Sequence, residues 1–390
     1  MKRFPLKVMR VITWLPWGGI EKRMVEVLKK LDREKFLPVV CCLRKKKGVY
    51  EDELREAGIR VIKLDFQSRL DPRGILSLAN LIKKERVDIL HSHMYRANIP
   101  SLIAGNIVRV RVKLVQVHNL EDWKRWREWW MERLLFPSAD RIIGVSRAVL
   151  EYERKYLKIP EDKGVVLYNG IDTDSYPYPP DEELKKSLGI PPEAKVVGEV
   201  ARLHPTKGQD VLIRCARKVL EKSPQAYFLL VGGGDYGKEL KRMVKEIGLD
   251  KRFIFTGAVR DPRPYYSIMD ISVLPSLQEG FSNTILESLA QGLPVVASRV
   301  GGNPEVIEEG REGFLVPYGE EDKLAERIIS LLRNESLRRK MGERAREKAE
   351  KFSLTKMVEN TENLYLSLYE EKLTFFRRGE EVGKDLEFRL

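Results

Sequence analysis

The chain has 390 residues, 43% of them hydrophobic, and a formal net charge of +13 at pH 7. This length exceeds one ordinary domain and suits two, at roughly 150 residues each. The hydrophobic content excludes a disordered chain, and no apolar run approaches the roughly 18 residues of a membrane span. After Met1-Lys2-Arg3 the sequence lacks a signal-peptide pattern, so we expect a cytoplasmic protein.

The net positive charge of the chain comes entirely from its N-terminal part. Residues 1–168 contain 36 Lys and Arg against 21 Asp and Glu, a net +15, and the remaining 222 residues have a net −2. Solubility does not require such a division, so we expect the N-terminal half to contact an anionic partner. Nucleic acid, an anionic membrane surface and a phosphate-bearing acceptor all fit this charge.

Short apolar runs that read as strands alternate with amphipathic helical stretches such as Glu21–Leu31 and Gly74–Glu85. The first series of runs is Val8–Thr13, Pro38–Leu43, Val61–Leu64, Asp88–His91, Lys113–Val117, Arg141–Val145 and Val165–Leu167. After the Pro-rich linker Tyr176–Pro180 the second series is Lys195–Val200, Tyr227–Val231, Phe253–Thr256, Ile271–Leu274, Val295–Ala297 and Phe314–Val316. This alternation predicts an α/β protein with two doubly wound, Rossmann-like domains whose strand ends face a central cleft.

Two features of the first half lie where strands end. Gly18 and Gly19 precede the helix Glu21–Leu31, where they leave helix N–H groups open to a phosphate or simply form a tight turn. His118 follows the strand Lys113–Val117 and should point into the cleft. Of the two histidines near another strand end, we expect His91 to be structural and His93 to line an acceptor pocket. The histidines and cysteines have no metal-ligand spacing, so we expect no metal site.

Four of the six tryptophans lie between residues 123 and 136. At 100° per residue, Trp123, Trp126, Trp130 and Leu134 share one face of a predicted helix, with Trp129 at its edge. Lys124, Arg125, Glu128 and Glu132 should cover the opposite side. Aromatic rings beside cations suit a membrane interface or a lipid acceptor. The alternative is that the tryptophans pack on the sheet of their own domain.

In the second half, Arg202 and Lys207 follow the strand Lys195–Val200. Fixed cations at this place suit a diphosphate whose negative charge grows as a glycosidic bond breaks, without a metal ion. The Gly-rich loop that contains Gly233 follows the next strand and should line the nucleotide side of the cleft.

Two carboxylates, Glu279 and Glu287, lie eight positions apart across a strand-to-helix junction. Between them, Ser282, Asn283 and Thr284 can present N–H groups at a helix N-terminus, which suits a phosphate. One carboxylate then faces a sugar and the other a ribose. The alternative is a capped helix with two solvated glutamates.

These motifs resemble the family-4 retaining glycosyltransferases, also called glycosyltransferase group 1. The resemblance spans roughly residues 6–370 and rests on three blocks. They are Trp17-Gly18-Gly19-Ile20-Glu21, Ala201-Arg202-Leu203-His204-Pro205-Thr206-Lys207-Gly208, and the stretch from Glu279-Gly280-Phe281 through Leu286-Glu287-Ser288 and Ala290–Ala297 to Gly301-Gly302-Asn303-Pro304-Glu305.

The resemblance implies the GT-B fold, with an acceptor domain at residues 1–168 and a nucleotide-sugar domain at 169–372. The final helix returns to the first domain. Leu354–Tyr369 is the candidate for this helix, and residues from about 373 to 390 are assigned to the first domain.

The same resemblance implies residue roles. His118, Glu279, Arg202 and Lys207 are expected to be catalytic, Glu287 to bind the ribose, and His118 to touch the sugar near the reacting carbon. The donor-binding set adds Gly18, Gly19, Gly233, Gly280, Phe281, Ser282, Asn283 and Thr284.

We therefore expect a metal-independent, retaining transferase that uses a nucleotide-diphosphate sugar, with UDP favoured over GDP, and no other cofactor. Its acceptor would be lipid-linked or a polysaccharide precursor, on the inner face of the cell membrane. A GT-B epimerase or phosphorylase is the alternative enzyme, and a basic nucleic-acid-binding protein is the alternative outside enzymes. The sequence has no recognised nucleic-acid module, so we expect no nucleic-acid partner.

Overall fold

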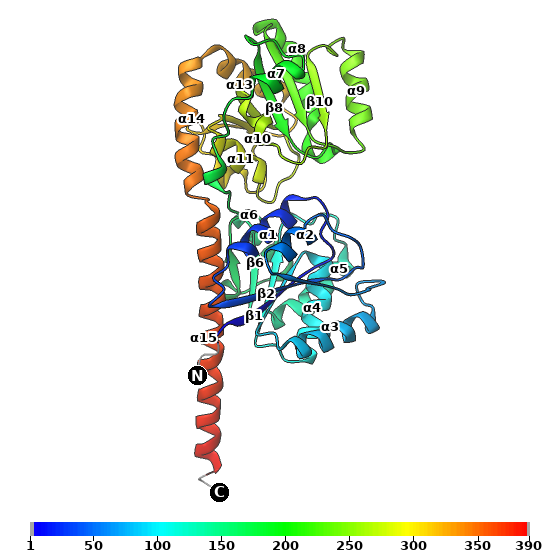
Figure 1. The fold of residues 1–390 in the computed structure, drawn as a ribbon, viewed down its shortest axis with the longest axis vertical. Coiled ribbons are helices and arrows are strands. Elements are labelled where there is room, and N and C mark those ends of the chain that lie inside the picture. Colours follow the sequence, from blue (N-terminus) through cyan, green and yellow to red (C-terminus); the bar gives the residue numbers. More distant parts are fainter. Residues whose placement is uncertain (1–3, 388–390) are drawn as a thin grey trace. The chain divides into compact units, whose positions relative to one another are not determined.

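The computed structural model describes residues 4–387, with side chains through Thr374, and the chain forms two compact units. The first comprises the described residues up to Asn169 and those from Thr355 onward, and the second is Gly170–Leu354. Each unit is built on one parallel sheet with helices packed on it (Figure 1). The predicted class, α/β with two doubly wound sheets, is confirmed.

The sheet of the first unit has seven strands in the order β3-β2-β1-β4-β5-β6-β7. The strands are β1 (Leu6–Ile12), β2 (Phe36–Cys42), β3 (Arg60–Lys63), β4 (Ile89–His93), β5 (Val112–Val117), β6 (Arg141–Gly144) and β7 (Gly164–Val166). The helices are α1 (Gly19–Lys30), α2 (Glu51–Glu56), α3 (Pro72–Glu85), α4 (Tyr95–Ile107), α5 (Trp126–Leu135), α6 (Arg147–Leu157) and α15 (Leu354–Glu387).

The sheet of the second unit has six strands in the order β10-β9-β8-β11-β12-β13. The strands are β8 (Lys195–Val200), β9 (Ala226–Val231), β10 (Phe253–Gly257), β11 (Ile271–Leu274), β12 (Val295–Ser298) and β13 (Gly313–Val316). The helices are α7 (Glu182–Ser187), α8 (Gln209–Lys222), α9 (Gly237–Glu246), α10 (Arg263–Ser267), α11 (Asn283–Gln291), α12 (Asn303–Val306), α13 (Glu321–Arg333) and α14 (Glu335–Glu350).

Burial on both faces explains why the strands read as continuous apolar runs instead of alternating ones. In β8, Val196 and Val197 are both fully buried, yet they belong to two different core clusters. All the strands expected from the sequence are present, with ends shifted by a residue or two. No helix in the part of the chain that the structure describes is long and apolar enough to cross a membrane.

Helix α15 returns the chain to the first unit. The Tyr365 hydroxyl accepts a hydrogen bond from Arg10 Nε at 3.2 Å and lies 2.7 Å from His91 Nδ1. Farther along, Arg111 donates to the Tyr369 hydroxyl. The returning segment therefore begins at Thr355, earlier than the expected start near 373. Most of the range 373–390 lies outside the residues whose side chains are described.

We expect Tyr365→Phe to destabilise the first unit by about 1–3 kcal/mol, because it leaves polar groups of buried Arg10 and His91 without a partner. Urea denaturation of the full chain, resolved into the transitions of the two units, measures this change. Tyr318→Phe is the control, since Tyr318 is 38% exposed in the second unit. Equal stability of Tyr365→Phe and the wild type would contradict the role given to this hydroxyl.

Candidate active site

The second unit has its topological switch point between β8 and β11. These strands pair in parallel, with Ile271 opposite Val197, although β9 and β10 intervene in the chain. Ligands of doubly wound sheets sit beyond the carboxyl ends of the strands at such a point. The loop after β8 carries Arg202 and Lys207, and the loop after β11 carries Glu279, so the topology brings the predicted residues together.

Lys207 and Glu279 form an ion pair. Lys207 Nζ lies 2.7 Å from Glu279 Oε1, which also accepts a hydrogen bond from Ser276 Oγ at 2.7 Å. Glu279 is 8% exposed, whereas Arg202 is exposed. The predicted phosphate-binding lysine thus directly contacts the predicted sugar-binding carboxylate.

Beneath this pair lies Glu199, which the sequence analysis missed. It is buried in β8, and Gln209 Nε2 donates to its Oε1 at 2.8 Å. Burial raises the pKa of Glu199 well above its usual range, and the nearby positive charge of Lys207 opposes this rise only in part. A single acidic residue inside an otherwise apolar strand was the available signal.

Helix α11 begins at the expected place. Ser282 caps it, with its Oγ accepting from the Ile285 N–H at 3.3 Å. The Thr284 hydroxyl donates to the carbonyl of Val200 at 2.8 Å, which ties the start of the helix to the end of β8. Phe281, by contrast, turns its ring toward Phe352, with the ring centroids 5.6 Å apart. The side chains of Phe281, Ser282 and Thr284 are therefore engaged within the protein.

Glu287 lies just over one turn into α11. It is 7% exposed, and the Tyr266 hydroxyl donates to its Oε2 at 3.0 Å. Tyr266 is fully buried and was not identified from the sequence. Because both predicted glutamates are buried and partnered, the alternative of two solvated glutamates is wrong.

Close backbone contacts hold the loops of this edge. A Cβ added to Gly301, which follows β12 and has φ +49°, would come within 1.6 Å of the Glu279 carbonyl oxygen. A Cβ on Gly232, after β9, would meet the Ala201 carbonyl oxygen at 1.9 Å. Only glycine fits at these two positions. The predicted donor-binding residue Gly233 is adjacent to Gly232 and lies in the same loop.

In the first unit, Gly18 is the N-cap residue of α1 and Gly19 is its first residue. A Cβ on Gly18 would lie 2.3 Å from Glu21 Oε2, so this carboxylate occupies the space beside the helix start. Burial raises the pKa of Glu21, and a hydrogen bond from its own backbone N–H lowers it by a smaller amount. The space beside the helix N-terminus is thus already filled by a carboxyl group of the protein.

His91, His93 and His118 gather at the carboxyl ends of β4 and β5. The His91 and His93 rings stack with centroids 4.5 Å apart, and His93 Nδ1 lies 3.0 Å from His118 Nε2. His118 is 7% exposed, and burial followed by the charge of Arg10 lowers its pKa to about 3. Burial also lowers the pKa of His91 and His93, so all three histidines are neutral at pH 7. Their contacts agree with a structural role for His91.

The tryptophan-rich segment differs from the prediction in its helix start. Helix α5 begins at Trp126, so Trp123 precedes the helix and does not share its face. Trp123, Trp126, Trp130 and Leu134 are nevertheless 49%, 73%, 61% and 63% exposed. Trp129 alone packs within its own domain, as the alternative expected, because its ring stacks on Tyr156 with centroids 4.3 Å apart. Trp126, Trp130 and Leu134, spaced four residues apart on α5, therefore form an exposed stripe, here called the Trp126 surface.

The side of this segment expected to lie opposite the tryptophans is buried at Lys124 and Glu132. Lys124 Nζ lies 2.8, 2.7 and 3.0 Å from carboxylates of Glu121, Glu132 and Glu153. Burial alone would lower the pKa of Lys124, but these carboxylates raise it. Burial raises the pKa of Glu153 to about 7 and that of Glu132 well above its usual range, against the effect of Lys124. This buried cluster fixes the segment to α6.

Comparison with known proteins agrees with this arrangement. Residues 17–175 match the family described as Glycosyltransferase Family 4, and residues 180–348 match Glycosyl transferases group 1. The chain is 31% identical over 295 residues to N-acetyl-alpha-D-glucosaminyl L-malate synthase of Bacillus anthracis, covering 74% of this chain and 77% of that protein. It is 26% identical over 372 residues to the UDP-Gal:alpha-D-GlcNAc-diphosphoundecaprenol alpha-1,3-galactosyltransferase of Escherichia coli, covering 91% and 95%.

Among solved structures, Anabaena Alr3699/HepE in complex with UDP superposes with a TM-score of 0.83 at 24% identity, covering 93% of this chain and all of that one. A glycosyltransferase from Rickettsia africae superposes with a TM-score of 0.83 at 25% identity, covering 94% and 99%. The two sheets with their flanking helices are those of the GT-B fold. The chain is an enzyme that belongs to the family-4 GT-B glycosyltransferases.

Proposed function

We propose that this enzyme is a retaining glycosyltransferase that moves a sugar from a UDP-sugar to a lipid-linked or polysaccharide-precursor acceptor without a metal ion. The observation that carries the proposal is the set of paired polar groups at the β8–β11 edge, Lys207 with Glu279 and Tyr266 with Glu287. The bound UDP in the Anabaena relative supports the choice of base. The E. coli relative and the Staphylococcus aureus capsular polysaccharide glycosyltransferase CapM support the acceptor class.

The donor would be held by groups of different chemistry. Its diphosphate would lie at the N-terminus of α11, where N–H groups and the helix dipole favour an anion. Arg202 and Lys207 would supply two positive charges for the leaving phosphate. Glu287 would accept hydrogen bonds from the ribose hydroxyls, and Glu279 would contact the sugar.

Retention would follow from a front-face reaction. The acceptor hydroxyl attacks the anomeric carbon on the side that the leaving diphosphate vacates, and the departing phosphate oxygen takes the hydroxyl proton. This route needs no protein base. His118, neutral at pH 7, would serve as a hydrogen-bonding partner of the sugar and not as a cationic acid.

Replacing Glu287 should weaken nucleotide binding. We expect Glu287→Gln to raise the Kd of uridine diphosphate by about 10- to 150-fold, the range that 1.5–3 kcal/mol per charge-assisted hydrogen bond gives. Calorimetry on folded protein measures this change, with exposed Glu326→Gln as the matched control. Unchanged affinity of a folded Glu287→Gln variant would exclude Glu287 as the ribose ligand.

Removing the cations should slow turnover more than it weakens donor binding, since the phosphate charge peaks in the transition state. We expect Arg202→Ala to lower kcat by about tenfold or more with a small change in donor KM. Lys207→Ala should also reduce stability, because Glu279 and Glu199 lose their cation. Thermal unfolding separates the two effects.

Two experimental results would contradict the kinetic roles given to these residues. If KM rises while kcat is unchanged in Arg202→Ala, this residue binds only the ground state. Activity should also persist in EDTA, and complete loss with recovery on adding a divalent cation would rule out the metal-free reaction.

We further propose that the Trp126 surface places the enzyme on the inner face of the cell membrane. Its tryptophans are exposed beside exposed Arg125, Arg127 and Arg133, and Arg127 lies 5.4 Å from the centre of the Trp126 ring. Aromatic rings anchor at a lipid interface, and each nearby cation adds about 1 kcal/mol on an anionic surface. The net +15 of residues 1–168 agrees with such a surface.

Replacing Trp126 and Trp130 together by Ser should reduce binding to anionic liposomes even at high salt, because salt screens the arginines but not the apolar rings. Hydrolysis of a UDP-sugar should stay near the wild-type rate. Val49→Ser with Leu76→Ser, both exposed in the same unit, is the control. If the wild type fails to sediment with anionic liposomes, the acceptor is soluble and the membrane assignment fails.

A further inference from the structure

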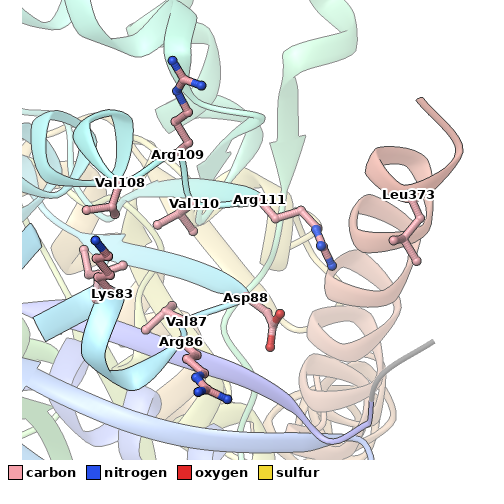
Figure 2. A pocket seen from close by; sticks show the side chains of 10 residues that line it. Lys83, Arg86, Val87, Asp88, Val108, Arg109, Val110, Arg111 and Leu373 are labelled. Carbon is pink, nitrogen blue, oxygen red and sulfur yellow. The ribbon is translucent and has the colours of Figure 1, made fainter. Parts of the chain in front are cut away.

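A pocket of about 550 Å³ lies in the first unit, at the sheet edge opposite the three histidines. Asp88 and Arg111 immediately precede the amino ends of β4 and β5, and both line it (Figure 2). The ends of α3 and α4 and one residue of α15, Leu373, complete the wall. Because β5 has six residues at roughly 3.3 Å each, this pocket is roughly 20 Å from His118. It is therefore separate from the proposed sugar-transfer residues of this unit.

Four cations line this pocket: Lys83, Arg86, Arg109 and Arg111. Its single carboxylate, Asp88, is already occupied, because its Oδ2 accepts from the backbone N–H of Lys7 at 2.9 Å. Within the described part of the chain, no carboxylate lies in ion-pair distance of the four cations. Among the described residues that line the pocket, positive charges therefore exceed negative ones by three.

Two of these arginines have a left-handed backbone conformation. Arg86 and Arg109 both have φ of +53°, one at the end of α3 and the other just after α4. Glycine is the usual residue in this left-handed region, and other residues adopt it at a cost. Both positions carry a long cation instead. Arg111 is oriented separately, by its hydrogen bond to Tyr369 and the ring of the same residue 4.8 Å away.

Apolar side chains form the rest of the wall, among them Val87, Val110 and Leu373. The volume lies within the range of small-molecule sites, which are usually apolar with a few polar groups, and exceeds what one inorganic anion needs. Guanidinium groups bind phosphate oxygens through paired hydrogen bonds. The pocket therefore combines a phosphate-binding charge with room for an apolar or ring-shaped body.

We propose that this pocket binds a phosphate ester, at a site distinct from the sugar-transfer site. The phosphate group would be attracted by the cations that line the pocket, and the body of the ligand would lie against the apolar wall. Two sources supply this chemistry: the headgroup of an anionic lipid and a soluble phosphate ester. The proposal does not depend on the proposed donor or acceptor.

The test compares Arg86→Gln/Arg109→Gln with Arg73→Gln/Lys84→Gln. The control pair removes two exposed cations from α3 that do not line the pocket. Calorimetry with inorganic pyrophosphate and flotation with vesicles of phosphatidylcholine and phosphatidylglycerol are run on all three full-length proteins. Thermal unfolding and UDP-sugar hydrolysis verify that each variant is folded and that its sugar-transfer residues are intact.

We expect the pocket variant to bind pyrophosphate at least about tenfold more weakly than the control pair. If the sugar-donor residues also bind this anion, the wild type shows two binding events and the pocket variant loses one of them. A matching loss of vesicle binding, relieved by pyrophosphate in the wild type, identifies the lipid headgroup as the source. Loss of pyrophosphate binding with unchanged vesicle binding identifies a soluble phosphate ester. If the pocket and control variants behave alike in both assays, the proposal is wrong.

Should Arg86→Gln/Arg109→Gln fail to fold, Arg111→Gln with Lys83→Gln provides a second test, because neither residue has a left-handed backbone. Failure of this second variant to weaken pyrophosphate or vesicle binding would also overturn the proposal. Failure of the proposed function is distinguishable from failure of the pocket proposal. In that case Glu287→Gln leaves nucleotide binding unchanged, while pyrophosphate binding still depends on Arg86 and Arg109.

Discussion

Parallel pairing of β8 with β11 is the constraint on which the proposed donor site depends. In a parallel sheet all carboxyl ends meet at one edge, and at this pair the chain departs in opposite directions. The loops of Lys207 and Glu279 are thereby placed beside each other, and Thr284 joins the start of α11 to the end of β8. Without this pairing, residues more than seventy positions apart in the chain would have no reason to meet.

Burial gives the two glutamates different electrostatic surroundings. Glu279 is paired with the cation Lys207, whereas Glu287 accepts from the neutral phenol of Tyr266. A lone exposed lysine would be mobile and strongly hydrated, but Lys207 is fixed by Glu279 above the buried Glu199. Removing such charges from water has a cost. On the proposed mechanism, this cost is offset because the fixed positive charge of Lys207 stabilises the leaving phosphate.

The sequence predicted the sheets well because each buried parallel strand is a continuous apolar run, and it located Arg202, Lys207, Glu279 and Glu287 because they follow such runs. It failed where tertiary contacts override local pattern. Helical periodicity placed Lys124 on the face opposite the tryptophans and did not indicate that it is buried, where it pairs with Glu153 of α6. Periodicity also extended the helix back to Trp123, since nothing local indicates that α5 starts at Trp126. Partners such as Tyr266 come from distant elements and left no local signal.

The three clustered histidines contribute no positive charge to the first unit. Those three rings are neutral, because burial and Arg10 both oppose their protonation. The buried cation Lys124 is paired with the carboxyl groups of Glu121, Glu132 and Glu153. Cations gather at the amino edge of the sheet, around Arg86 and Arg109, and beside the Trp126 surface. Since neither place includes the neutral histidines, our proposals assign attraction to anions and contact with the sugar to separate groups, so a substitution should change one without changing the other.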